Sequence, residues 1–207
     1  MQRYSIKILD SKIKIMNNIS KAIETDIANL LRSKVPKIES EVKAIVQSRL
    51  MISPEILSIK AGTLRLDFGI PIDPTDQIIY SIVNSIHVYF RNFRLNKKSV
   101  STILSIYIQP SDFKNLLENA YGVVITEQLE PIPWLEWLLT GGDAVQITGW
   151  QVDYGDFSGS RTGAAIMVPV GFFKVDPQFS GTEENNFITR ALVNVDEDIY
   201  RIIRGVL

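Results

Sequence analysis

The segment from Pro133 to Arg190 constrains the fold of this chain more than any other part of it. It begins with the aromatic turn Pro133-Trp134-Leu135-Glu136-Trp137-Leu138-Leu139, and it contains all three tryptophans of the sequence. A loop of small residues at 155–163 follows and leads into the apolar run 164–170. Because few residues here suit acid–base or nucleophilic chemistry, the segment indicates a surface that holds a partner rather than one that turns over a substrate.

The composition is that of a folded globular protein. With 207 residues, the chain is long enough to bury a substantial core. Its 45% hydrophobic and 22% charged residues argue against long disorder. The formal net charge of −1 gives no reason to expect the chain to wrap nucleic acid. The charge is uneven, however, because residues 1–50 hold ten Lys/Arg against five Asp/Glu, which leaves the remainder acidic.

The chain has no cysteine, which excludes disulfides, thiol nucleophiles and thiolate metal sites. Isoleucines alternate with lysines near the N-terminus, so the start of the chain lacks the apolar core of a signal peptide. No run of about 18 uncharged apolar residues occurs. The sequence therefore predicts a soluble chain with no membrane segment.

Apolar residues recur every three or four positions between Asn17 and Leu50, which is the pattern of an amphipathic helix that faces a core. Pro36 interrupts this stretch, and a proline inside a helix lacks the amide donor and clashes with the preceding turn. The sequence therefore predicts two helices, with one continuous helix as the alternative. Ser53-Pro54-Glu55 predicts the start of the next helix, with serine as its cap and proline in its first turn.

The following segment predicts one strand and one long helix. Leu64, Leu66 and Phe68 alternate with polar residues, which is the periodicity of a strand with one solvated face. Asp73-Pro74-Thr75-Asp76 predicts the start of a helix whose apolar side continues to Phe93. Four cations near the expected end of this helix either complement its dipole or bind an anion or a partner: Arg91, Arg94, Lys97 and Lys98.

The second half of the chain predicts further strands and a terminal helix. The expected elements are a strand at 99–108, a helix at 110–117, a strand at 123–126, a hairpin that pairs 145–154 with 164–170, and a final helix from Thr182 to Val206. The predicted fold class is α+β, with an antiparallel sheet flanked by helices, N-terminal amphipathic helices and a C-terminal helix. We expect a basic helical segment at 1–52 and a core domain at 53–207.

The sequence offers little catalytic or metal-binding chemistry. His87 is the only histidine, expected in mid-helix, and no cysteine is present to complete a zinc site with it. Neither a G-x-S-x-G elbow nor a phosphate-binding G-x-x-x-x-G-K motif occurs. We expect no metal, no cofactor and no enzymatic activity. The alternative is a cell-wall hydrolase that uses carboxylates alone, with Glu136, Asp153 and Asp156 as the residues to test.

Six residues are candidates for contacts with another subunit or protein. Trp134 and Trp137 share one face of a helical turn, where they either fill the core beneath the sheet or project as anchors of a subunit contact. Arg161 is either an interface arginine or part of a surface loop that has no partner. The full set is Trp134, Trp137, Phe157, Arg161, Phe187 and Arg190.

Four groups of residues together resemble a family of virion structural proteins from tailed bacteriophages. They are Ser53-Pro54-Glu55…Gly62-Thr63-Leu64-Arg65…Phe68-Gly69-Ile70-Pro71, then Pro133-Trp134-Leu135-Glu136-Trp137-Leu138-Leu139, then Ser160-Arg161-Thr162-Gly163-Ala164-Ala165-Ile166-Met167, and Phe179-Ser180-Gly181-Thr182…Asn185-Asn186-Phe187-Ile188-Thr189-Arg190-Ala191. The resemblance covers most of the chain from about residue 53 onward, and the first fifty residues carry no matching motif. The chain looks like a neck or tail-completion component, one of the small proteins that cap the tail tube and join it to the head.

The resemblance implies a geometric role in the virion. Tail terminators of this kind form a hexameric ring in which helices flank an antiparallel sheet. The implied partners are further copies of the chain and neighbouring neck, tail-tube or sheath proteins, at the head–tail junction of a particle assembled in the host cytoplasm. The resemblance implies no membrane contact and no specific recognition of nucleic acid, although DNA would pass through the ring. Another junction or baseplate component, such as a stopper or connector, is the alternative within the same class.

Overall fold

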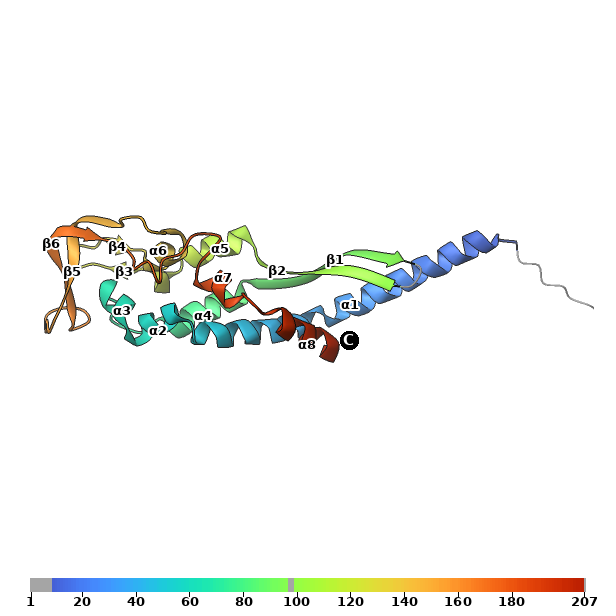
Figure 1. Ribbon diagram of the computed structural model, residues 1–207, viewed down its shortest axis with the longest axis horizontal. Helices are drawn as coiled ribbons and strands as arrows, with labels where there is room; N and C mark the ends of the chain where they lie inside the picture. The colour runs from blue at the N-terminus through green and yellow to red at the C-terminus, as the bar shows by residue number, and fades with distance from the viewer. Residues whose placement is uncertain (1–8, 97–98, 207) are drawn as a thin grey trace, which may run out of the picture.

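A computed structural model describes residues 9–96 and 99–206 of the chain. The molecule is elongated, and α1, Lys12–Met51, runs along most of its length, with its first turns projecting beyond the other elements (Figure 1). The remaining helices are α2, Pro54–Ala61; α3, Thr63–Asp67; α4, Thr75–Asn84; α5, Pro110–Leu117; α6, Trp134–Thr140; α7, Phe187–Ala191; and α8, Asp196–Val206. The strands are β1, Ile86–Asn96; β2, Ser99–Ile108; β3, Val124–Ile125; β4, Pro131–Ile132; β5, Ile147–Tyr154; and β6, Ala165–Phe173.

The predicted α+β class is confirmed, with antiparallel strands flanked by helices, a long N-terminal helix and a C-terminal helix. Among the described residues the strands form three separate antiparallel pairs: β1 with β2, β3 with β4, and β5 with β6. The β1–β2 pair lies along α1, and the β5–β6 hairpin lies at the opposite end of the molecule from the start of α1 (Figure 1). The predicted division of the chain after residue 52 stays a prediction.

The prediction of two helices separated at Pro36 was wrong, because α1 continues through this residue. Pro36 is exposed, so the carbonyl of Arg32, which loses its helical donor, faces the solvated side of the helix. On the opposite side, Leu31, Ile38 and Val42 are buried on one stripe. Tertiary packing of this stripe therefore outweighs the local cost of the proline.

Two further predictions of element type were wrong. Residues 64–68 belong to helix α3 and its C-cap, because Leu64 and Phe68, four positions apart, are both buried on one helical face. The helix expected to reach Phe93 ends at Asn84, and β1 follows it. Ile86 and Val88 point inward along this strand, whereas His87 lies on its outward face and not in a helix. Arg91 and Arg94 likewise lie on a strand, and Lys97 and Lys98 lie outside the described residues.

The sequence signals for the start of α2 and for the β5–β6 hairpin predicted the structure correctly. The hydroxyl of Ser53 accepts the amide of Ile56 at 3.3 Å and caps α2, as predicted. The hairpin of β5 and β6 is confirmed, with Trp150 opposite Pro169 and Tyr154 opposite Ala165. The prediction of one continuous helix from Thr182 to Val206 was wrong, because the chain forms α7 and α8 with a break between them.

The break between α7 and α8 is held by a side chain of α1. Arg49 donates hydrogen bonds to the carbonyls of Val193 and Asn194, at 2.8 and 3.3 Å, and pairs with Asp198 at 3.0 Å. Asn194 has a positive φ of 61°, which interrupts the helical path. Asn186, whose side chain accepts from the amides of Ile188 and Thr189, caps α7 in place of the expected Thr182.

We predict that Pro36→Ala stabilises the protein. Alanine restores the amide donor to the carbonyl of Arg32 and removes the ring that clashes with the preceding turn, so we expect a gain of about 1–3 kcal/mol in the free energy of unfolding. Urea denaturation measures it, and Lys37→Ala at the next exposed position is the control. A loss of stability in Pro36→Ala would show that the proline is required in this helix.

Candidate interface residues

Trp134 and Phe187 lie in the core. Both side chains are 0% exposed in the described chain, and they come from α6 and α7, which pack against each other. Trp134 Nε1 is buried with no hydrogen-bond partner among the described residues. The sequence left open whether Trp134 fills the core or projects as an anchor, and the structure places it in the core of a single copy.

Trp137 is half-buried and belongs to a group of four rings that joins α3, α6 and β6. The ring of Phe68 lies 6.0 Å from Trp134, 6.3 Å from Trp137 and 5.9 Å from Phe173, measured between centroids. Trp137 and Phe173 are 6.1 Å apart. These separations are those of favourable aromatic pairs. Sequence reasoning did not select Phe68 or Phe173 as members of this cluster.

Arg161 is exposed, yet its guanidinium has partners within the chain. Its Nη1 donates to the carbonyl of Ile125 at 2.9 Å. The guanidinium also covers Gly69, where an added Cβ would lie 2.9 Å from Nη2 and where φ is +60°. Arg161 therefore ties the 155–163 loop to β3 and to the turn after α3. Phe157, which is half-buried, folds back within the same loop, and its amide donates to the carbonyl of Gly163 at 3.0 Å.

Arg190 forms a salt bridge that links α7 to α2. Its Nη2 lies 2.6 Å from Oε1 of Glu55, a carboxylate whose residue is only 3% exposed. Nη1 of Arg190 also donates to the side-chain oxygen of Asn185 at 3.2 Å. A buried carboxylate is costly without a partner, so this arginine holds the two helices in register.

The carboxylates that were weighed for catalysis come from α6, from β5 and from the loop that follows β5. Glu136 is exposed on α6, Asp153 is exposed on β5, and Asp156 is exposed in the loop that follows β5. His87 Nε2 lies 2.9 Å from Asp112 Oδ2 at the start of α5. No group of three or more His, Cys, Asp or Glu positioned to hold a metal ion occurs within residues 9–96 and 99–206.

Two carboxylates have displaced pKa values. Burial raises the pKa of Asp67, the hydroxyl of Tyr154 that donates to Oδ1 of Asp67 lowers it, and the nearby charge of Asp176 raises it, so that the net shift is upward. Burial also raises the pKa of Tyr154, and so do its hydrogen bond to Asp67 and the nearby charges of Asp67 and Asp176. At Glu39, burial raises the pKa, but the hydrogen bonds from Lys43 and from the amide of Val88 outweigh it and leave the pKa lowered.

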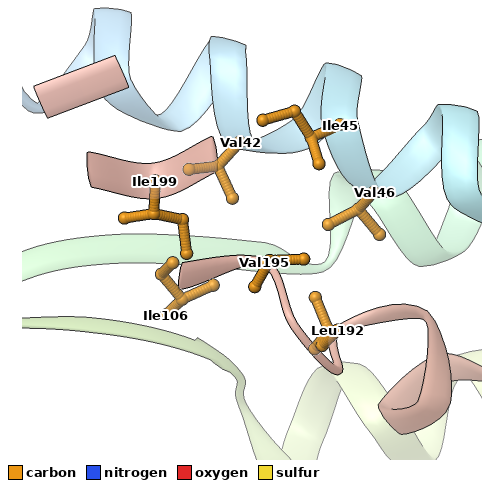
Figure 2. A pocket seen from close by; sticks show the side chains of 7 residues that line it. All are labelled: Val42, Ile45, Val46, Ile106, Leu192, Val195 and Ile199. Carbon is orange, nitrogen blue, oxygen red and sulfur yellow. The ribbon is translucent and has the colours of Figure 1, made fainter. Parts of the chain in front are cut away.

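Two hollows adjoin α1. The first, shown in Figure 2, has a volume of about 10 Å³, which is at most enough for one water molecule. Its lining is entirely apolar: Val42, Ile45, Val46, Ile106, Leu192, Val195 and Ile199. The second is an open groove of about 350 Å³ between α1 and α8, where Arg49 and Asp198 already bind each other. Neither hollow gathers convergent polar groups around an enclosed space, as ligand sites do.

Exposed apolar residues form the features that sequence reasoning missed. The first buried residue of α1 is Ala28, and a stripe of apolar residues that begins just before the helix and continues along its first half faces solvent: Leu9, Ile13, Met16, Ile19, Ile23 and Leu30. At the other end of the molecule, the β5–β6 hairpin exposes Trp150, Val170 and Phe172. Val170 has a φ of 75°, a region that β-branched residues rarely adopt. The successive spacings of four, three, three, four and seven residues from Leu9 to Leu30 were the available signal for the first group.

No known protein family, curated protein or solved structure matches this chain. Among the described residues, no helix combines the length and the apolar character that crossing a bilayer requires. Any functional conclusion therefore depends on the residues and surfaces described above.

We predict that Arg190→Ala destabilises the protein by about 3 kcal/mol, because it leaves the Glu55 carboxylate buried and unpaired. Adding Glu55→Gln to this variant should recover part of the loss, since a neutral amide costs less to bury. The control is Arg201→Ala, whose pair with Asp198 is exposed on the arginine side and should contribute less than about 1 kcal/mol. Equal losses in Arg190→Ala and Arg201→Ala, measured by urea denaturation, would contradict this assignment.

We also predict a pH-dependent effect of Asp67→Asn. A raised pKa in the folded state means that Asp67 favours folding most below its ordinary value of 3.8, and that this contribution is lost as pH rises through the folded-state pKa. Asparagine does not titrate and keeps an oxygen that accepts from Tyr154. The free energy of unfolding of the variant minus that of the wild type should therefore increase between about pH 3 and pH 6. A difference that stays constant or decreases would refute the prediction, with Asp153→Asn as the control for loss of one exposed carboxylate.

Proposed function

We propose that this chain is a non-enzymatic structural subunit of a tailed-bacteriophage virion, a neck or tail-terminator protein that forms a ring at the end of the tail tube and joins the tail to the head. The observation that carries the proposal is the uncovered apolar stripe on the first half of α1, where Ile13 is 74% exposed. Contiguous exposed apolar residues are characteristic of surfaces that bind another protein.

The energy of covering this stripe supports an assembly. A fully buried aliphatic side chain stabilises a protein by about 1.5–3 kcal/mol, so covering six largely exposed ones contributes on the order of 5 kcal/mol or more for each copy. This is enough to matter against the cost of association when several contacts act together. A single copy gains none of this energy, whereas a closed assembly gains it at every junction.

The open strand edges support the same conclusion. Among the described residues, each sheet has only two strands, so β5 and β6 both leave one side of the backbone without a sheet partner. Unpaired edges are templates for pairing with another chain. The four groups of residues that resemble tailed-phage virion proteins give the assembly its proposed identity. The resemblance favours a ring located at the neck of the virion.

The test is a nonsense mutation in the gene within its phage, followed by cryo-electron microscopy of the particles. We expect filled heads and separate tails whose upper ends are not capped, and we expect wild-type protein supplied from a plasmid to restore joined virions. Density for the protein at the baseplate of wild-type particles, together with heads and tails that are still joined in the mutant, would contradict the proposal and favour the baseplate alternative.

A further inference from the structure

The two ends of the elongated molecule carry opposite charge. At one end lie residues 9–38 of the N-terminal segment and the β1–β2 pair, which we call the basic end. Its described residues include eight Lys/Arg and three Asp/Glu, a formal charge of +5. The basic residues are Lys12, Lys14, Lys21, Arg32, Lys34, Lys37, Arg91 and Arg94.

The opposite end is acidic. Residues 123–186, which include α6 and the β5–β6 hairpin, hold nine Asp/Glu and two Lys/Arg, a formal charge of −7. We call this region the acidic end. In Figure 1 its strands lie at the far left, whereas the first turns of α1 lie at the far right. The small net charge of the whole chain therefore hides a strong separation of charge along its length.

These charges are mostly not neutralised within one copy. Among the described residues, none of the nine carboxylates of the acidic end forms a salt bridge. Of the described cations of the basic end, only Lys14 does so, with Asp10 at 2.6 Å. Opposite charges at the ends are thus available to a partner, and each end also presents apolar side chains, Ile13 and Ile23 at one and Trp150 and Phe172 at the other.

We propose that the basic end of one copy binds the acidic end of a second copy. A second copy is the one partner that complements both ends at once, because it supplies an acidic surface to the first and a basic surface to the second. A nucleic acid would be attracted to one end and repelled by the other. This inference rests on the proposed self-assembly and names the two surfaces through which it occurs.

The charge also decides which surfaces meet. A contact between two basic ends, or between two acidic ends, places like charges together and is disfavoured. The contact is therefore between unlike surfaces. Such a contact either repeats from copy to copy until a ring closes, or forms twice within one antiparallel pair. Exposed apolar residues on both surfaces add burial that the charges alone do not supply.

The test measures self-association of the full chain by sedimentation, at about 0.05 M and about 0.5 M salt, since screening weakens contacts between exposed charges. We expect weaker association at the higher salt. The variant Lys12→Glu/Lys21→Glu/Lys37→Glu reverses the basic end, and Glu136→Lys/Asp153→Lys/Asp156→Lys reverses exposed positions of the acidic end. Each should weaken association about tenfold or more at low salt.

A mixture of the two variants provides the decisive comparison. The three substitutions change the basic end of the first variant from +5 to −1 and the acidic end of the second from −7 to −1, so each variant alone has lost one of its two strongly charged ends. The first variant keeps its acidic end and the second keeps its basic end, so mixing should restore a contact between these two unaltered ends. The matched control Lys60→Glu/Lys114→Glu/Arg204→Glu changes the net charge equally at positions outside both ends and should associate more strongly than the first variant. Circular dichroism melts verify that every variant is folded.

Several outcomes would overturn the inference. A chain that stays monomeric at low salt, a chain whose association ignores salt and both reversals, and a monomer that binds nucleic acid through its basic end each contradict it. The outcome is separable from that of the proposed function. Rings that still form at the head–tail junction with both charge-reversed variants would contradict the inference but not the proposed function. Association that is restored on mixing, in a protein that is absent from the junction, would support the inference and contradict the proposed function.

Discussion

The packing of Phe68 against three other rings is the interaction on which the rest of this structure depends. Phe68 follows α3 and is fully buried, and its ring contacts Trp134 and Trp137 of α6 and Phe173 at the end of β6. A two-stranded hairpin alone is marginally stable in water. The β5–β6 hairpin is therefore held in place by this cluster at its base, by the Tyr154 hydrogen bond to Asp67, and by Arg161 of its loop, which reaches β3.

Local signals in the sequence predicted the elements that local chemistry determines. Ser53 and Pro54 marked the start of α2, and alternation with a glycine-rich loop marked the β5–β6 hairpin. Local signals failed where contacts distant in sequence decide. Nothing near Pro36 reveals that the β1–β2 pair and the core cover the opposite face of α1 and keep the helix intact. Residues 86–93 fit a helical pattern and a strand pattern equally well, and pairing with β2 selects the strand.

The same distinction applies to the candidate interface. Residue type selected Trp134, Phe187 and Arg190 as anchors, because tryptophan, phenylalanine and arginine are enriched at interfaces. The same residue types also fill cores and satisfy buried carboxylates, and only tertiary structure separates these roles. The exposed stripe on α1 was present in the sequence as periodicity, but a stripe reads as core-facing until the structure shows that no other described element covers its first turns.

That uncovered helix links stability to assembly. Residues 12–27 of α1 contain no buried side chain, and an isolated helix of about 12–15 residues is only marginally stable in water. Its exposed isoleucines are not covered by other described elements, and of the lysines within residues 12–27 only Lys14 forms a salt bridge, with Asp10 just before the helix. A partner surface that accepts both charge and apolar area would therefore stabilise the helix as it binds. The basic N-terminal part, which carries none of the residues that resemble virion proteins, would then be the part that makes one copy depend on the next. A molecule with unlike ends and an uncovered apolar stripe at one of them would gain by placing its ends on other copies, and this favours a geometric role in an assembly.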